Sequence, residues 1–91
     1  MKKNLLYIVH EYAIDDYEDR WNDYHIFYHK ENAIKKLQDI KEQDMMPIVD
    51  EEGYEIHCDN ETHFEAGIEG EYSRGCVCVK IITTPILDYH F

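Results

Sequence analysis

Hydrophobic and polar positions change their spacing several times along the chain, and each change predicts a different element. Residues 5–12 begin as a continuous apolar run rich in β-branched and aromatic side chains, which is typical of a strand buried on both faces. Residues 13–23 hold neither a helical nor a strand period, so a loop is expected there. Residues 25–28 form a short apolar run that predicts a second strand.

An apolar stripe predicts one clear helix over residues 30–43. The stripe consists of Ala33, Ile34, Leu37 and Ile40. Their spacing of i, i+1, i+4 and i+7 puts all of them on one helical face. We expect the helix to end at residues 45–47, because a residue that precedes a proline is displaced from the helical region of backbone space.

After Pro47 the spacing changes to two and predicts a meander of strands. Residues 50–53 resemble a turn, residues 54–58 a strand, and residues 76–82 a last strand that Pro85 terminates. Between them, residues 63–72 alternate strictly, with Phe64, Ala66, Ile68 and Tyr72 on one face and His63, Glu65, Glu69 and Glu71 on the other. The fold class predicted is α+β, a mostly antiparallel sheet of about five strands in the order β-β-α-β-β-β with one helix packed on one face.

Size and charge narrow the possible functions. The chain has 91 residues, enough for a single domain over residues 1–91, and its 20 acidic and nine basic residues give a net charge of −11. Residues 46–91 alone carry ten acidic and two basic residues, a net charge of −8. Such a surface repels nucleic acid and anionic lipid and attracts a basic protein, although acidity also serves solubility alone.

The start of the chain carries no signal for export. Lys2 and Lys3 resemble the basic start of a signal peptide, but Glu11, Asp15 and Asp16 follow where its apolar segment would continue. We therefore expect a cytoplasmic location, in the host cytoplasm if a phage encodes the protein.

Histidines and cysteines are the first candidates for a metal site. His57, Cys58 and His63 lie at the two ends of one predicted hairpin, and Cys76 and Cys78 share a strand face. Neither the Cys-x2-Cys nor the His-x3-His spacing of structural zinc sites is present. Cys76 and Cys78 are more simply explained as small apolar side chains of a core. We therefore expect no metal and no cofactor. Whether the thiols have a metal or redox role stays open.

The sequence offers little for catalysis. Cys58 is flanked by Asp59 and Glu61, and negative neighbours disfavour a reactive thiolate. No nucleophile elbow and no phosphate-binding glycine loop is present. The acidic residues 15–19 lack the spacing of a calcium loop. We therefore expect a protein without enzymatic activity, with a small metal- or thiol-dependent enzyme as the remaining alternative.

Rows of carboxylates favour binding to another protein. Residues two apart on a strand stand ~6.6–6.8 Å apart, so the predicted strand at residues 63–72 presents a regular negative row. The loop expected at residues 13–23 adds further acidic residues next to the aromatic Trp21. Aromatic anchors within an acidic rim suit an interface with a basic partner. The predicted partner-binding residues are Asp15, Asp16, Glu18, Asp19, Trp21, Glu55, Asp59, Glu65, Glu69 and Glu71. Alternatively, Trp21 fills the core and the acids are only solvated.

Two resemblances add to this interpretation. The first strand ending at His10-Glu11-Tyr12, the acidic segment, the aromatic strand and the helix opening at residues 29–33 together resemble small α+β proteins of unknown function from Gram-positive bacteria and their phages. That resemblance covers residues 4–43 and implies no functional residues. In size and acidity the chain also resembles phage inhibitors of host nucleases, including anti-CRISPR proteins, several of which imitate nucleic acid.

These observations lead to two hypotheses. The preferred one is a small non-enzymatic inhibitor or adaptor, encoded by a phage or mobile element, that binds a basic nucleic-acid-binding protein such as a nuclease effector by nucleic-acid mimicry. The alternative is a bacterial accessory domain that acts by homodimerisation or by docking through a sheet edge and the apolar tail at residues 86–91.

Overall fold

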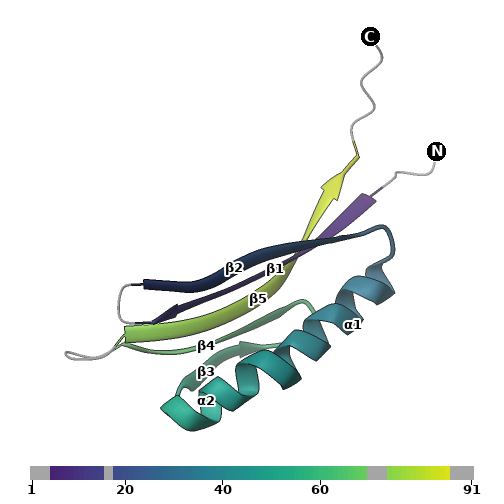
Figure 1. Ribbon diagram of the computed structural model, residues 1–91. Coiled ribbons are helices and arrows are strands. Elements are labelled where there is room, and N and C mark those ends of the chain that lie inside the picture. Colours follow the sequence, from purple (N-terminus) through teal and green to yellow (C-terminus); the bar gives the residue numbers. More distant parts are fainter. Residues whose placement is uncertain (1–4, 16–17, 70–73, 87–91) are drawn as a thin grey trace.

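The computed structural model describes residues 5–15, 18–69 and 74–86, and for Asp19 only the backbone. Within these ranges, five strands form one antiparallel sheet in the order β2-β1-β5-β4-β3, beside a single helical segment (Figure 1). The strands are β1 (Leu5–Asp15), β2 (Glu18–Phe27), β3 (Glu55–Asp59), β4 (His63–Glu69) and β5 (Arg74–Pro85). The predicted α+β class with an antiparallel sheet is therefore confirmed.

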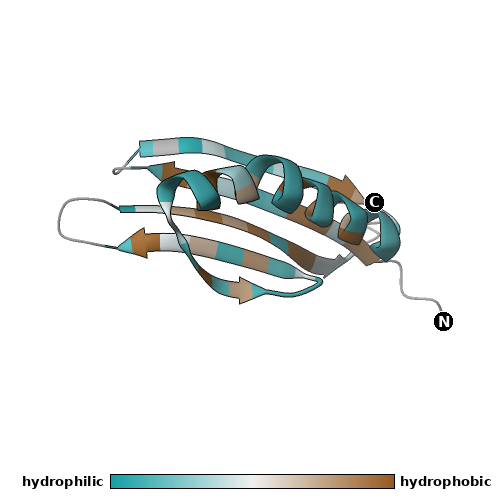
Figure 2. Ribbon diagram, turned by 90° about the horizontal axis from the view of Figure 1, so that it is seen from below, coloured by the Kyte–Doolittle hydropathy of each residue, from teal (hydrophilic) through white to brown (hydrophobic). Residues whose placement is uncertain are grey.

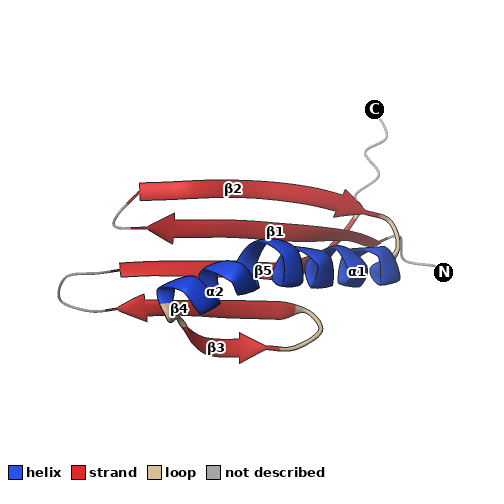
Figure 3. Cartoon of the chain, turned by 60° about the horizontal axis from the view of Figure 1, so that its bottom comes forward, coloured by secondary structure: helices blue, strands red, loops and turns tan. Residues whose placement is uncertain are grey.

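The helical segment has three parts that follow one another directly. They are α1 (Lys30–Ile40), the π-helical turn η1 (Lys41–Met45) and α2 (Met46–Glu52). The segment runs lengthwise across one face of the sheet (Figure 3). None of the helices in the described ranges is long and apolar enough to cross a membrane.

One hydrophobic core fills the space between the helical segment and the sheet. Leu37 of α1, Phe64 of β4 and Val79 of β5 are completely buried. In Figure 2 most of the helical ribbon has the colours of hydrophilic residues, and apolar stretches lie along several strands. Because strand residues alternate between faces, Val9 and Ala13 of β1 and Val77 and Val79 of β5 point into the core.

The helix does not end at residues 45–47 as predicted, because it continues through a π-helical turn into α2. The buried positions Ala33, Leu37 and Ile40 follow α-helical spacing, but the next buried residue is Met45, five positions on. A turn closed by i→i+5 hydrogen bonds adds one residue and so brings Met45 back to the core face; the Met46 amide donates to the Lys41 carbonyl.

Pro47 does not end the helical segment: one residue separates it from the π-helical turn, and the residues on both sides of it are helical. The segment continues to Glu52 and ends at Gly53, whose φ of 69° is the left-handed conformation typical of a helix end. Residues 50–52, predicted as part of a turn, are therefore helical.

The prediction of a loop over residues 13–23 is wrong. β1 and β2 pair through most of this region, from Tyr7 opposite Phe27 to Asp15 opposite Glu18, with one register shift beside Ala13. β1 is interior but is not buried on both faces: its buried residues alternate with half-buried ones. No helix of the described ranges covers the second face of the sheet, which we call the open face (Figure 1). It includes Ile8, His10 and Tyr12 of β1.

Candidate functional site

One row of residues across the open face brings chemistry-bearing side chains from four strands together. Tyr12 of β1 pairs with Cys78 of β5, Cys78 pairs with Glu65 of β4, and Glu65 pairs with Cys58 of β3. His63 precedes Glu65 by two residues and therefore lies on the same face in the neighbouring row. The side chains of His63, Glu65 and Cys78 converge, and we call them the His-Glu-Cys cluster.

The cluster is closely spaced. The His63 Nε2 atom lies 3.7 Å from the Cys78 Sγ atom and 3.4 Å from a Glu65 carboxylate oxygen. Cys78 is 1% exposed, whereas the side chains of His63 and Glu65 are 38% and 40% exposed. The Cys78 thiol is therefore the buried member of the cluster, and the His63 imidazole and Glu65 carboxylate are its solvent-exposed members.

Burial keeps the thiols of β5 neutral. It raises the pKa of Cys78 to about 11, opposed by a hydrogen bond with the Tyr12 hydroxyl and reinforced by the charge of Glu65. Burial and the same carboxylate also raise the pKa of Cys76. A neutral thiol is a poor nucleophile, so these two cysteines are unsuited to attack a substrate by themselves. Cys58, Cys76 and Cys78 form no disulfide with one another.

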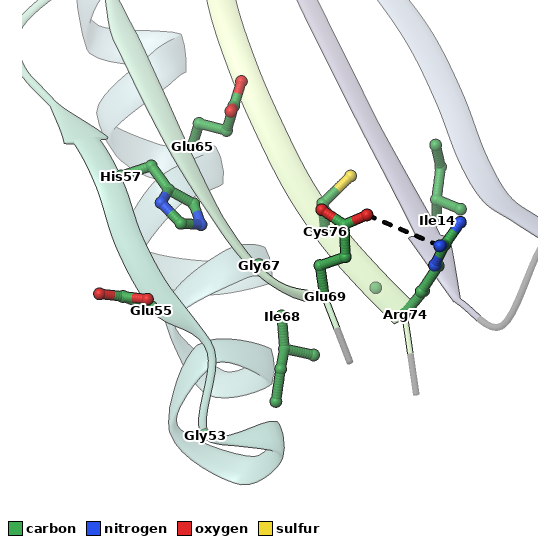
Figure 4. Close-up of a pocket in the computed structure, with 11 residues that line it drawn as sticks. Ile14, Gly53, Glu55, His57, Glu65, Gly67, Ile68, Glu69, Arg74 and Cys76 are labelled. Carbon is green, nitrogen blue, oxygen red and sulfur yellow. Dashed lines mark ion pairs between the residues drawn. The ribbon is translucent and has the colours of Figure 1, made fainter. Parts of the chain in front are cut away.

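A cavity of about 530 Å³ adjoins the cluster, between β3, β4 and the start of β5. Its polar lining includes Glu55, His57, Glu65 and Glu69 (Figure 4). Glu69 faces Arg74 across the β4–β5 pair at 3.7 Å, drawn as the dashed line in Figure 4. Part of the negative charge in the predicted carboxylate row is therefore compensated.

The strands place the carboxylate row only partly as expected. Phe64, Ala66 and Ile68 lie on the face opposite His63, Glu65 and Glu69, which confirms the predicted alternation over the described part of that strand. Glu55 joins the row, because its partner Gly67 lies on the open face. Asp59 does not join it: Asp59 is opposite the core residue Phe64 and accepts a hydrogen bond from Lys41. Glu71 lies outside the described residues.

The predicted acidic segment around Trp21 is a β-hairpin. Asp15 pairs with Arg20 at 3.3 Å, Glu18 is exposed, and Asp16 lies outside the described residues. The backbone of Asp19 belongs to β2, which is all that is described of it.

Trp21 is half-buried and packs against the core, as the alternative interpretation expected, so it does not form an exposed anchor. Its indole Nε1 is buried without a hydrogen-bond partner.

A second acidic surface lies on the helical segment and was not predicted as a site. Every acidic residue between positions 39 and 52 is exposed: Asp39, Glu42, Asp44, Asp50, Glu51 and Glu52. We call this surface the acidic helix surface. Its one cation, Lys41, turns towards the sheet, where its Nζ atom lies 2.5 Å from Asp59 and 5.3 Å from the centre of the Phe64 ring. The acids therefore face solvent, and the only lysine among residues 39–52 is directed towards the sheet.

The sequence did contain a signal for this surface. Residues 30–36 hold three lysines and one glutamate, whereas residues 39–52 hold six acids and one lysine. The signal is hidden when the helix is expected to end before Pro47, since half of these acids then fall in a turn.

Comparison of the chain with protein-family models, with curated proteins and with solved structures finds no match.

Proposed function

We propose that this protein is a small non-enzymatic inhibitor or adaptor that binds a basic, nucleic-acid-binding protein and occupies the surface on which that partner holds nucleic acid. The acidic helix surface carries the proposal. Six exposed carboxylates lie on one continuous helical segment, and the only lysine among them is bound to Asp59. At a rise of 1.5 Å per residue these acids extend over roughly 20 Å, a length suited to a groove that binds a nucleic-acid backbone.

Rigidity supports the same function. Leu37, Met45 and Val49 anchor the helical segment in the core along its whole length. The carboxylates are therefore presented by a fixed backbone, which reduces the entropy lost when a partner binds. Affinity that rests on such exposed charges falls as salt screens them.

A pull-down with charge-reversal variants tests the proposal. The untagged chain, coupled to a resin, is incubated with bacterial lysate at low salt, and bound proteins are identified by mass spectrometry. We expect basic nucleic-acid-binding proteins that elute as salt rises and that added duplex DNA displaces. The variant Glu42→Lys, Asp50→Lys, Glu51→Lys should lose them.

A matched variant separates the acidic helix surface from net charge. Glu18→Lys, Glu31→Lys, Glu61→Lys changes the net charge equally at exposed positions outside residues 39–52. This variant should retain most of the binding. Equal loss of binding in both variants would mean that net charge alone explains the binding. Binding that added duplex DNA does not displace would contradict nucleic-acid mimicry.

A second candidate function is docking or homodimerisation through the open face, and one observation favours it. Ile26 and Tyr24 of β2 are 62% and 60% exposed, and Ile82 of β5 is exposed on the same face. Together with Ile8 they form an apolar patch at one end of the sheet. Removal of residues 86–91 tests the apolar tail: if self-association is lost in sedimentation while the basic partners remain, the tail serves dimerisation and the first function stands.

A further inference from the structure

We propose that His63, Glu65 and Cys78 bind a divalent transition-metal ion with the ligand preferences of zinc. The inference is independent of the proposed function, because the cluster lies on the open face and the acidic helix surface lies on the opposite side of the sheet. It rests on three properties of the cluster: the spacing of the ligand atoms, their chemical identity and the way in which the sheet holds them.

The spacing matches a tetrahedral ion. With bonds of about 2.0–2.1 Å to nitrogen and oxygen and about 2.3 Å to sulfur, tetrahedral angles place nitrogen and oxygen about 3.3 Å apart and nitrogen and sulfur about 3.6 Å apart. The corresponding distances in the structure are 3.4 Å, between His63 and Glu65, and 3.7 Å, between His63 and Cys78. One ligand atom from each of the three residues lies within 4.8 Å of the others. Little movement is needed to close the site around an ion.

The donor set selects the class of metal. A nitrogen, a sulfur and one carboxylate oxygen suit zinc and cobalt, whereas magnesium and calcium require mainly oxygen ligands. Three protein ligands leave a fourth tetrahedral position, which faces solvent because all three side chains rise from the same side of the sheet. An ion can therefore enter from the open face, and water can complete the coordination.

The backbone fixes the relative positions of the ligands. Glu65 and Cys78 are direct cross-strand partners, and His63 is two residues before Glu65 on the same strand face. β4 and β5 are both interior strands of the sheet. The Tyr12 hydroxyl, hydrogen-bonded with the Cys78 sulfur, would orient that ligand from β1. The ion displaces the thiol proton, so binding releases a proton to solvent.

Cobalt titration of the untagged, chelator-stripped full chain in the presence of a non-thiol reductant tests the site. Cobalt(II) bound to a thiolate gives a near-ultraviolet charge-transfer band, and tetrahedral coordination gives intense visible bands. We expect both to saturate at one ion per chain and to disappear when zinc is added. Cys78→Ser should abolish the charge-transfer band, and His63→Ala should weaken binding at least about 100-fold.

Two cysteine variants serve as matched controls. Cys76 lies two residues from Cys78 on the same strand face, and Cys58 lies opposite Glu65, yet neither belongs to the cluster. Cys76→Ser and Cys58→Ser should keep the band and the affinity. Tyr12→Phe should weaken binding about 10-fold and leave the band in place.

The outcomes against the proposal are specific. Absence of a charge-transfer band in the wild-type chain at millimolar cobalt would overturn it, as would a band that survives Cys78→Ser but is lost in either control. Circular dichroism checks the fold of each variant, and His63→Ala, at a half-exposed position, keeps the test decisive if Cys78→Ser does not fold. The charge-reversal variants of the helix should bind cobalt unchanged, so failure of one proposal is distinguishable from failure of the other.

Discussion

The two faces of the sheet are made by alternate residues of the same strands, yet they differ in chemistry. The covered face presents Val77 and Val79 of β5 to the helix, and both are completely or almost completely buried. The open face presents Cys76, Cys78 and Lys80 of the same strand beside histidine, tyrosine and glutamate from its neighbours. Only the covered face has the composition of a hydrophobic core.

This difference separates hydrophobic burial from polar chemistry within one sheet. Apolar side chains on the covered face stabilise the fold by filling the core. Thiol, imidazole and carboxylate groups on the open face bury less apolar surface and therefore contribute less to stability. Its side chains are held in place by pairing across β1, β5 and β4 rather than by a covering helix. Substitutions on the two faces should therefore have unequal effects on stability.

Among the described residues, truncation of the largest fully buried side chain should have the largest effect. Phe64 is fully buried beneath the helical segment, and Phe64→Ala should reduce the free energy of unfolding by about 3–5 kcal/mol through lost transfer energy and a cavity. Urea denaturation followed by circular dichroism measures the change. Tyr24→Ala, which truncates an exposed ring on the open face, is the matched aromatic control. A loss in the control as large as that for Phe64 would remove the distinction between the faces.

A methyl group added where two strands approach closely should have an intermediate effect. The Cβ atom of Gly67→Ala would lie 2.6 Å from the Gly75 carbonyl oxygen and 3.0 Å from the Cys76 Cβ atom. The closer neighbour is backbone, so the β4–β5 pair itself must shift. Such overpacking costs about 1–3 kcal/mol, measurable in the same urea experiment. Unchanged stability would show that the open face is looser than the structure indicates.

The sequence predicted the fold class and the alternation of β4 because both follow from local spacing. Phe64, Ala66 and Ile68 show the strand period directly. The extension of β1 and β2 into residues 13–23 was missed because polar residues there hide the period of two, and only the pairing partners show which side faces the core. The π-helical turn was missed because the five-residue step from Ile40 to Met45 breaks the helical period where Pro47 already predicts an end.

The cluster on the open face could not be predicted in the same way. Cys78 and Glu65 are 13 positions apart in the chain and meet only because β4 pairs with β5 in one particular register. Sequence proximity instead grouped His63 with His57 and Cys58. His57 lines the adjoining cavity and is not part of the cluster, and the Cys58 thiol donates a hydrogen bond to the His63 carbonyl oxygen at 3.6 Å. Of the sequence-based metal candidates, His63 and Cys78 belong to the cluster, and Glu65 was the missing ligand.

The Tyr54 hydroxyl, on the covered face, should make the stability of the protein fall at alkaline pH. Burial, reinforced by the charges of Asp15 and Glu52, raises the pKa of Tyr54 above its ordinary value of 10.0. The folded chain therefore holds this proton more tightly than the unfolded chain. The resulting stability is fully present below pH 10 and is lost as the pH rises through the folded pKa. Tyr54→Phe has no hydroxyl proton to lose at this position, so its free energy of unfolding should fall less steeply above pH 10.

Urea titrations of wild type and Tyr54→Phe between pH 8 and about pH 11 measure the difference. The thiols of Cys76 and Cys78 titrate in both proteins, so their contributions cancel from it. Parallel curves throughout this range would mean that the Tyr54 hydroxyl is as well solvated in the folded chain as in the unfolded one.

The smallest effect is expected at the apolar end of the open face. Ile26 is 62% exposed, so Ile26→Thr keeps the β-branched shape favoured in strands and should change the free energy of unfolding by no more than about 0.5 kcal/mol. Sedimentation at increasing concentration, run on wild type and variant, shows whether the patch has a partner in a second copy of the chain. If the wild type is a dimer and Ile26→Thr a monomer of unchanged monomer stability, the apolar end of the open face mediates self-association. If both remain monomeric at the highest concentration, the apolar end of the open face does not mediate self-association, and homodimerisation through this face is contradicted.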